Sequence, residues 1–156
     1  MDIETKITKE LIDAPLPPPP MGALGAWVEF RGVVRGEEDG QPITAIEYDP
    51  YLPMAEREMQ RLLRKRAAMR PCLAARVIHR VGIVRVGEAA VYVGIASRHR
   101  AEAFTLLADF MDDLKRDVPI WKQRVIFNLD PVCADASQTL GSPYSPISEL
   151  TGASLV

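Results

Sequence analysis

The residues best suited to chemistry lie between Ser97 and Lys122, and most of them are basic. His99 and Arg100 follow an apolar segment and begin a predicted helix, and Lys115 lies near the end of that helix. The first turn of a helix presents free backbone N–H groups, so basic side chains beside it favour the binding of a phosphate or another anion. We therefore expect an anion-binding site in this stretch.

His99 and Arg100 are the first candidate pair. A histidine can hydrogen-bond a substrate oxygen, while the two N–H groups on one edge of a guanidinium bind a phosphate. The alternative is structural, with the histidine capping the helix and the arginine paired to Glu102 or another surface acid. The sequence leaves both interpretations open.

Lys115 is the second candidate. A lysine near the C-terminal end of a helix is favoured by the helix dipole alone. An amine crowded by other cations, however, gives up its proton more readily and then acts as a nucleophile or proton carrier. Arg116, Lys122 and Arg124 would supply that crowding if the chain reverses direction at Pro119.

Three further side chains have both a functional and a structural interpretation. Arg35 could reach an anionic ligand, or it could pair with the acids of the turn that follows it. Trp121 could lie against a heterocycle with Lys122 near a charged substituent, or it could pack into the core or a dimer interface. His79 could be a ligand, but it lies in the middle of a predicted strand, which favours a structural histidine.

The strands that must position these residues follow from their apolar and β-branched patterns. We predict that residues 25–34 and 43–48 form an antiparallel pair with one buried face. Residues 74–86 and 88–97 are predicted to form a long hairpin, and residues 121–127 a last strand.

Amphipathic helices are predicted over residues 54–69 and 100–116, the second ended by Pro119. Short hairpins interleaved with helices predict an α+β fold, a mainly antiparallel sheet with helices packed on it. A parallel doubly wound sheet is the alternative.

The length of 156 residues predicts one domain. We assign residues 1–128 to a single catalytic α+β domain, in which residues 1–22 form an N-terminal strand or short helix and a proline-rich strap. Residues 129–156, rich in proline and serine, are predicted to be a C-terminal tail.

Composition excludes several function classes. With 47% hydrophobic residues and a net charge of -2, the chain is globular and is not expected to bind nucleic acid or a membrane surface. Cys72 and Cys133 form no C-x-x-C pair, so we expect plain thiols and neither a zinc site nor a redox motif. The charged N-terminus and the lack of a long apolar run predict a soluble, cytoplasmic protein. No phosphate-binding P-loop, dinucleotide-binding or serine-hydrolase motif is present.

An ordered series of short motifs resembles the large, catalytic subunit of molybdopterin synthase, the MoaE family. The series runs over roughly residues 25–125 and comprises Phe30-x-Gly32-x-Val34-Arg35, His79-Arg80-x-Gly82, His99-Arg100-Ala101-Glu102-Ala103-Phe104, Leu114-Lys115 and Val118-Pro119-Ile120-Trp121-Lys122. The histidine–arginine helix start with its lysine, followed by the Trp–Lys segment at the right interval, is the most specific part.

This resemblance implies an α/β hammerhead fold and a sulfurtransferase that converts cyclic pyranopterin monophosphate into the dithiolene molybdopterin. It implies a central homodimer in a heterotetramer, in which each large subunit binds a small ubiquitin-like sulfur carrier. The C-terminal Gly-Gly thiocarboxylate of that carrier enters a site shared across the dimer and donates sulfur. No cofactor or metal is implied.

The site residues implied by the resemblance fall into two groups. Lys115 would be the essential catalytic lysine beside the thiocarboxylate, with Lys122 completing the pocket as a second catalytic group. The phosphorylated pterin would be bound by Arg35, His99, Arg100, Lys122, Gln123 and Arg124.

The chain departs from the family pattern at three places. Gln123 and Arg124 follow the Trp–Lys pair, where the family usually has a second basic residue and then an acid. Val33 stands where a lysine is common, and the tail lacks the usual tryptophan-bearing ending. The alternative function is therefore a non-catalytic homologue that serves as a dimeric carrier-binding or scaffolding module, and a third is an unrelated anion-binding α+β domain.

Overall fold

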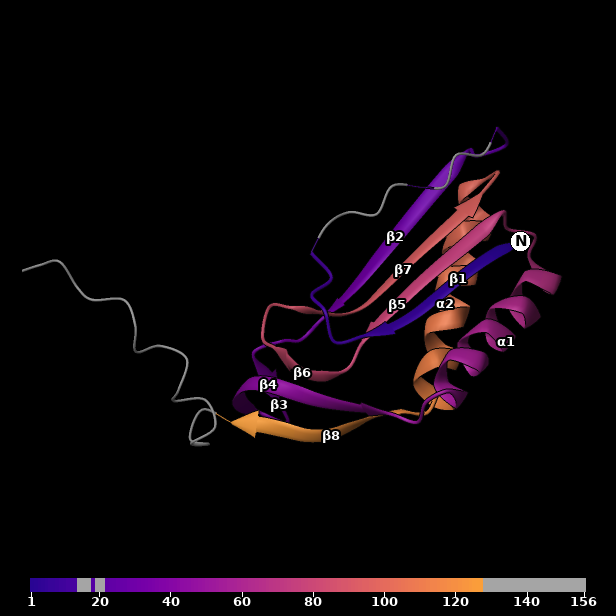
Figure 1. Ribbon diagram of the computed structural model, residues 1–156. Helices are drawn as coiled ribbons and strands as arrows, with labels where there is room; N and C mark the ends of the chain where they lie inside the picture. The colour runs from indigo at the N-terminus through magenta and orange to yellow at the C-terminus, as the bar shows by residue number, and fades with distance from the viewer. Residues whose placement is uncertain (14–17, 19–21, 128–156) are drawn as a thin grey trace, which may run out of the picture.

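The structure is a computed structural model that describes residues 1–13, 18 and 22–127. Two helices and eight strands form its regular elements (Figure 1). In chain order they are β1 (Asp2–Thr8), β2 (Ala26–Val33), β3 (Glu37–Glu38), β4 (Gln41–Pro50), α1 (Met54–Met69), β5 (Ala74–Arg80), β6 (Gly82–Arg85), β7 (Ala89–Ser97), α2 (Arg100–Asp117) and β8 (Ile120–Phe127).

The larger sheet has the strand order β1-β5-β7-β2. β1 is parallel to β5, whereas β5 with β7 and β7 with β2 are antiparallel. Both helices lie on one face of this sheet (Figure 1). The mainly antiparallel α+β class predicted from the sequence is confirmed.

The smaller sheet is built around β4, which pairs antiparallel with β3, β6 and β8. It adjoins the larger sheet at the junction of β5 and β6, where Gly82 adopts a φ of 75°. A positive φ is accessible to glycine without the Cβ clash that other residues suffer, so the chain can turn sharply there. β5 therefore belongs to one sheet and β6 to the other.

One predicted strand pairing is wrong, and another is only partly correct. Residues 25–34 and 43–48 do form strands, but β2 pairs with β7, and β4 pairs with β3, β6 and β8. The long hairpin of residues 74–86 and 88–97 is correct only for β5 and β7. The predicted strand 74–86 is in fact two strands, β5 and β6, and β6 pairs with β4 of the smaller sheet.

The helices were predicted correctly in extent, and their buried faces form the main core. α1 buries Ala55, Met59, Leu62 and Leu63, and α2 buries Ala103, Leu106, Phe110 and Leu114. These positions repeat every three or four residues, as one helical face requires. Three other large apolar residues of the helices, Met54, Met69 and Phe104, are exposed.

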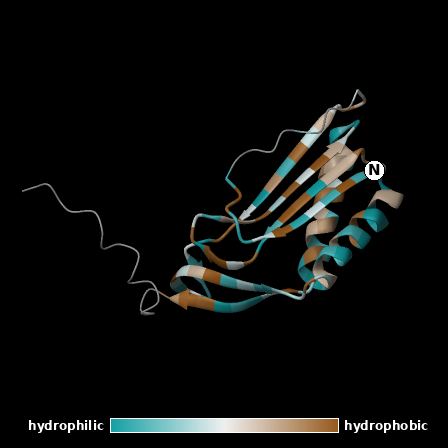
Figure 2. Cartoon of the chain, viewed as in Figure 1, coloured by the Kyte–Doolittle hydropathy of each residue, from teal (hydrophilic) through white to brown (hydrophobic). Residues whose placement is uncertain are grey.

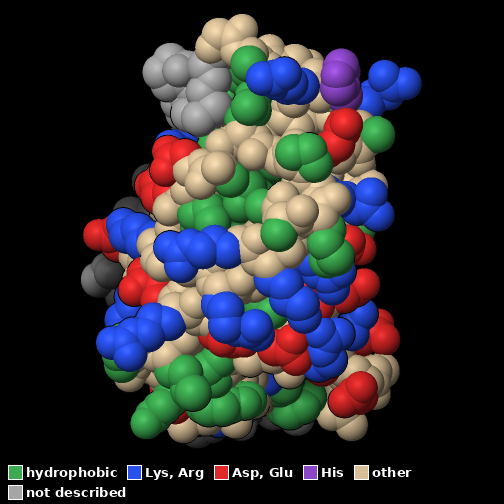
Figure 3. All heavy atoms as spheres, turned by 90° about the vertical axis from the view of Figure 1, so that its right-hand side faces the viewer, with side chains coloured by type: hydrophobic (Ala, Val, Ile, Leu, Met, Phe, Trp, Pro, Cys, Tyr) green, Lys and Arg blue, Asp and Glu red, His purple; other side chains and the backbone are tan. Residues whose placement is uncertain are grey.

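Figure 2 shows hydrophilic and hydrophobic residues alternating along the edge strands β1 and β2 of the larger sheet, as expected when side chains point alternately to its two faces, whereas the central β7 is buried throughout. Seen from the side of α1, the surface carries Lys and Arg side chains interspersed with Asp and Glu (Figure 3). This mixed charge is typical of a solvated helix face. Neither of the two described helices is long and apolar enough to span a bilayer.

Candidate functional site

A pocket of about 630 Å³ lies where the two sheets meet the C-terminal end of α2. Its volume is within the range of about 300–1,000 Å³ that is usual for small-molecule sites. β2, β4, β7, α2 and the start of β8 all contribute to its walls. The lining residues are Phe30, Gly32, Val33, Val34, Arg35, Glu38, Ile46, Tyr48, His79, Ala90, Val91, Met111, Leu114, Lys115, Val118, Ile120, Trp121 and Lys122.

The pocket gathers three cations from distant parts of the chain. Arg35 follows β2, Lys115 lies in the last turn of α2, and Lys122 lies in β8. α2 ends at Asp117 and β8 begins at Ile120, so the helix ends before Pro119, as predicted, and the chain continues as a strand. Three of the sequence-predicted site residues therefore share one pocket.

The three cations differ in their partners. Arg35 and Lys122 both form ion pairs with Glu38, which lines the same pocket. The exposed Lys115 makes no side-chain hydrogen bond or ion pair with any of the described residues. A positively charged amine without a counter-ion therefore stands at the pocket wall.

A β-bulge in β8 fixes the direction of Lys122. Lys122 pairs with Tyr48 and Arg124 pairs with Glu47, so Gln123 is an extra residue without a partner on β4. Directly paired residues project to the same face of a sheet, and successive residues to opposite faces. Lys122 therefore projects to the same face of the sheet as Tyr48, which is the pocket side. In a regular strand, Lys122 and Arg124 would share a face because they are two positions apart, but the bulge places them on opposite faces.

Gln123 and Arg124 are consequently not brought to the pocket. Neither residue is among those that line it in the described part of the chain. The Arg124 side chain instead forms an ion pair of 3.3 Å with Glu47 on the opposite face of the sheet. Two of the residues that depart from the family pattern, Gln123 and Arg124, thus lie outside the pocket, whereas the third, Val33, lines it.

His99 and Arg100 lie at the other end of α2. The 15 residues from Arg100 to Lys115 rise about 22 Å along the helix, at about 1.5 Å per residue. The His99 backbone caps the helix, but its side chain makes no capping hydrogen bond. Arg100 has no ion pair with Glu102 or another described acid. Within one chain, the length of α2 separates His99 and Arg100 from the pocket.

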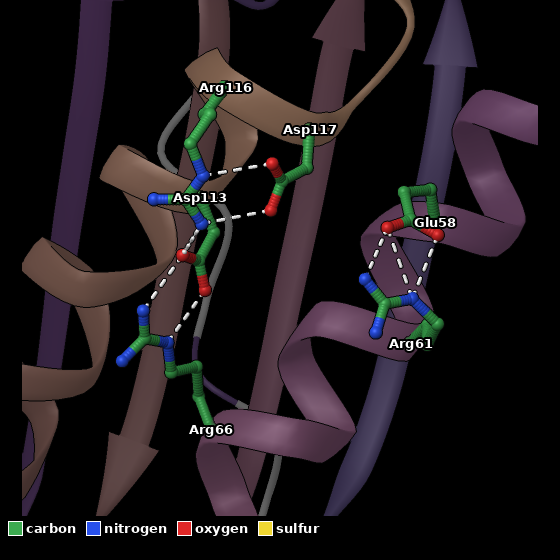
Figure 4. Close-up of polar contacts among 6 residues, drawn as sticks. All are labelled: Glu58, Arg61, Arg66, Asp113, Arg116 and Asp117. Carbon is green, nitrogen blue, oxygen red and sulfur yellow. Dashed lines mark hydrogen bonds and ion pairs between the residues drawn. The ribbon is translucent and has the colours of Figure 1, made fainter.

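An ionic network anchors the last turns of α2 behind the pocket (Figure 4). Arg66 of α1 donates to both oxygens of the buried Asp113 carboxylate, at 2.6 and 2.7 Å. Arg116 donates to Asp113 at 2.6 Å and also binds Asp117. The Arg66 hydrogen bonds lower the pKa of Asp113 to about 2. Arg116 is thus occupied by acids and does not crowd Lys115.

The inner wall of the pocket holds a histidine and a tyrosine. The Nδ1 atom of the buried His79 lies 2.8 Å from the Arg80 carbonyl oxygen, which assigns the N–H to Nδ1. Burial lowers the pKa of His79, so the ring is neutral at pH 7. Its ring meets the Tyr48 ring edge-on, with centroids 5.7 Å apart, and burial raises the pKa of Tyr48. This geometry agrees with a structural histidine.

The rim of the pocket carries Trp121, whose surface is 55% exposed. Apolar side chains such as Phe30, Val91 and Met111 line the interior. The pocket therefore offers an apolar wall for a ring system beside cations for an anionic substituent.

Sequence reasoning missed Glu38 and Tyr48 as pocket residues. Glu38 was considered only as a local partner for Arg35, and its contact with Lys122 joins residues 84 positions apart. The alternation of apolar and polar residues in 43–48 did place one face of that strand inward, which was the available signal for Tyr48.

Metal-binding and thiol chemistry have little basis in the described residues. No group of three or more His, Cys, Asp or Glu side chains there could hold a metal ion. Cys72 is a buried free thiol, and burial raises its pKa, which makes it a poor nucleophile. Cys133 lies outside the described residues.

Comparison with known proteins is consistent with this arrangement. Residues 4–117 match the family model described as MoaE protein. The molybdopterin synthase catalytic subunit of Thermoplasma volcanium is 38% identical over 104 residues, which cover 67% of this chain and 76% of the relative. The subunit of the same name from Homo sapiens is 36% identical over 101 residues, which cover 65% of this chain and 54% of the relative. The alignment thus spans only about half of the human protein.

Solved structures share the fold. Molybdopterin synthase from Staphylococcus aureus has a TM-score of 0.67 and 29% identity, covering 71% of this chain and 80% of that one. A complex of subunits 1 and 2 of molybdopterin-converting factor from Helicobacter pylori has a TM-score of 0.55 and 23% identity, covering 70% of this chain and 75% of that one.

Proposed function

Because the chain belongs to the MoaE protein family, we propose that it is the catalytic subunit of a molybdopterin synthase. The reaction is the conversion of cyclic pyranopterin monophosphate into molybdopterin, with sulfur from a thiocarboxylated carrier. The observation that carries this proposal is the meeting of Arg35, Lys115 and Lys122 in one pocket.

The pocket residues divide the chemistry between them. Arg35 and Lys122 bind the phosphate of the pterin, because fixed cations form charge-assisted hydrogen bonds with phosphate oxygens. The ring system lies against the apolar wall near Trp121, at the exposed rim. Phosphate and ring are thereby held together while the side chain of the pterin receives sulfur.

Lys115 lies beside the incoming thiocarboxylate. Attack of sulfur on the pterin side chain develops negative charge and requires proton transfer. An ammonium without a counter-ion stabilises such charge and donates a proton, and Lys115 has no partner among the described residues. Arg116, held by Asp113 and Asp117, is not available for this role.

The sulfur donor is a small ubiquitin-like carrier subunit with a C-terminal Gly-Gly thiocarboxylate. An extended tail without side chains is narrow enough to enter the pocket, which is lined by the exposed Lys115 and Trp121. A solved protein of this fold from Helicobacter pylori is itself a complex of two subunits of molybdopterin-converting factor. Two sulfur atoms require two carrier molecules for each dithiolene.

A second copy of the chain completes the site in a homodimer, and two carriers make it a heterotetramer. His99 and Arg100 lie about 22 Å from Lys115 along α2, so they serve the pocket of a partner subunit. Phe104, one turn after Arg100, is 57% exposed and would be covered by such a contact. The isolated monomer is then inactive.

The alternative of a non-catalytic homologue drew on Gln123 and Arg124. Both residues lie outside the pocket lining, while Arg35, Lys115 and Lys122 are within it. This placement favours the catalytic function.

The test is dithiolene formation by purified protein mixed with a thiocarboxylated carrier and the cyclic pterin. We expect turnover by the wild type, loss of turnover in Lys115→Ala, and near-normal turnover in Lys65→Ala, which removes an exposed helical lysine away from the pocket. Binding of the carrier should be largely retained in Lys115→Ala, because one lysine contributes little to a large interface. A Lys115→Ala variant as active as the wild type would refute the proposed site.

A further inference from the structure

The Glu38 carboxylate occupies the cationic side of the pocket. One of its oxygens accepts a hydrogen bond from the Lys122 ammonium, and the other lies 3.3 Å from the Arg35 guanidinium. Its side chain is only 15% exposed, against 47% for Lys122 and 74% for Arg35. Two of the three pocket cations thus share one carboxylate of the same chain as their counter-ion.

A tight hairpin brings Glu38 to this position. β3 pairs with the first residues of β4, and Asp39 and Gly40 connect the strands with φ values of 51° and 78°. Two successive positive φ values are typical of the two-residue turn that joins antiparallel strands most closely. The backbone of Glu38 is therefore held beside β4 (Figure 1).

The contact with Lys122 is tertiary, since 84 positions separate the two residues. It also keeps Glu38 ionised, because the Lys122 hydrogen bond holds the pKa of the carboxyl below its usual value. An anionic group entering the pocket must therefore meet a negative charge already bound to the cations it needs.

We propose that Glu38 is a positioning residue that acts as an exchangeable counter-ion: it holds Lys122 and Arg35 in the empty pocket, and a phosphate group of the ligand replaces its carboxylate on both. This inference deepens the proposed function and rests on it for the identity of the natural ligand. Ion pairs with such exposed partners contribute little stability, so a doubly charged phosphate can displace them.

The exchange gives the pocket a preference for phosphorylated ligands. A ligand without phosphate cannot take the place of the carboxylate, so Glu38 remains bound to Lys122 and occupies the mouth of the subsite. Specificity then comes from a competing internal anion as well as from attraction to the cations.

The test is calorimetric titration of the full-length protein with inorganic phosphate as the probe. Glu38→Gln removes the competing charge and keeps the side-chain shape, so we expect phosphate to bind about three- to tenfold more tightly than to the wild type. Glu37→Gln is the matched control, since it makes the same change of net charge at the neighbouring position. The Glu37 side chain has no ion pair with a described residue, and only its backbone carbonyl accepts from Arg35. We expect less than about a twofold change in the control.

Repeating the Glu38 substitution in a protein that lacks Lys122 shows whether the gain depends on the Glu38–Lys122 contact. In Lys122→Met the main partner of Glu38 is absent, so adding Glu38→Gln should improve phosphate binding much less than it does in the wild type. Circular dichroism and thermal unfolding of each variant show whether it is folded.

Three results would overturn the exchange: equal gains in Glu38→Gln and Glu37→Gln, weaker phosphate binding in Glu38→Gln, or no phosphate binding by either protein. The first would mean a general charge effect, and the second would mean that the carboxylate is needed to hold the cations. None of these results bears on dithiolene formation by the wild type, which tests the proposed function separately.

Discussion

Arg66 of α1 and Asp113 of α2 form a two-point ion pair, with hydrogen bonds of 2.6 and 2.7 Å to the two carboxylate oxygens (Figure 4). The Asp113 carboxylate is fully buried, so its charge depends on this arginine and on Arg116. The pair links the two helices two residues before Lys115. The position of Lys115 therefore depends on a contact between α2 and a different helix.

Replacement of Asp113 by asparagine should lower the free energy of unfolding at pH 7 by about 2 kcal/mol, the equivalent of the shift in its pKa from 3.8 to about 2. Because the folded-state pKa is the lower one, the stabilisation is complete above about pH 4 and is lost as the pH falls toward 2. Urea unfolding of both proteins from pH 7 to pH 3 should show the difference shrinking. The control is Asp112→Asn at a neighbouring exposed position, and an equal loss there would contradict this account.

Mixing two inactive variants should restore activity if the site is shared between copies. When Lys115→Ala and Arg100→Ala chains are co-expressed, half of the dimers are mixed and each mixed dimer has one intact site, giving about a quarter of wild-type turnover. Lys115→Ala with Lys122→Met is the matched control, because both residues lie in the pocket of one chain and no mixed dimer regains a whole site. Equal recovery in the two mixtures, or none in either, would exclude a shared site.

Lys122 and Arg124 should respond differently to the same substitution. Lys122→Met should reduce kcat/KM by about 10- to 100-fold, because a hydrogen bond to a charged group contributes about 1.5–3 kcal/mol. Arg124→Met removes an exposed ion pair with Glu47 and should change kcat/KM less than about threefold. Steady-state kinetics with the cyclic pterin as the varied substrate measures both. A larger effect at Arg124 would mean that the bulge in β8 does not direct Lys122 alone to the substrate.

Gly25 should tolerate no side chain. A Cβ atom there would lie 2.1 Å from the Arg98 backbone carbonyl oxygen, and backbone atoms cannot move aside as a flexible side chain can. We expect Gly25→Ala to cost about 1–3 kcal/mol, measured by thermal unfolding. Gly22→Ala, where no atom of the described residues beyond the chain neighbours lies within 4 Å of the added Cβ, should be nearly neutral. Similar losses in both variants would show that chain flexibility, and not the close contact, is responsible.

The extents of the helices could be predicted because the information is local. The apolar spacing within residues 54–69 and 100–116, with Pro119 after the second, sufficed to place α1 and α2. Strand pairing was predicted less well, since it depends on partners far away in sequence. β2 and β4 follow each other in the chain beyond the short β3, yet they belong to different sheets.

The site was predictable to a similar degree. The resemblance pointed to Arg35, Lys115 and Lys122, and the pocket contains all three. The separation of Arg100 from Lys115 could have been read from the helix itself, because its rise per residue is fixed. The pairing of Glu38 with Lys122 could not be read from the sequence, since it arises only when β3 and β8 meet beside β4.

The extra residue in β8 has a consequence for how the protein can diversify. Because Gln123 lacks a partner on β4, the alternation of side chains between the two faces of the sheet shifts by one residue at this position. Substitutions at Arg124 alter the outer side of the sheet without reaching the anion subsite, while Lys122 keeps its direction. One unpaired residue thus allows the outer surface at Arg124 to change while Lys122, two positions away, keeps its place in the pocket.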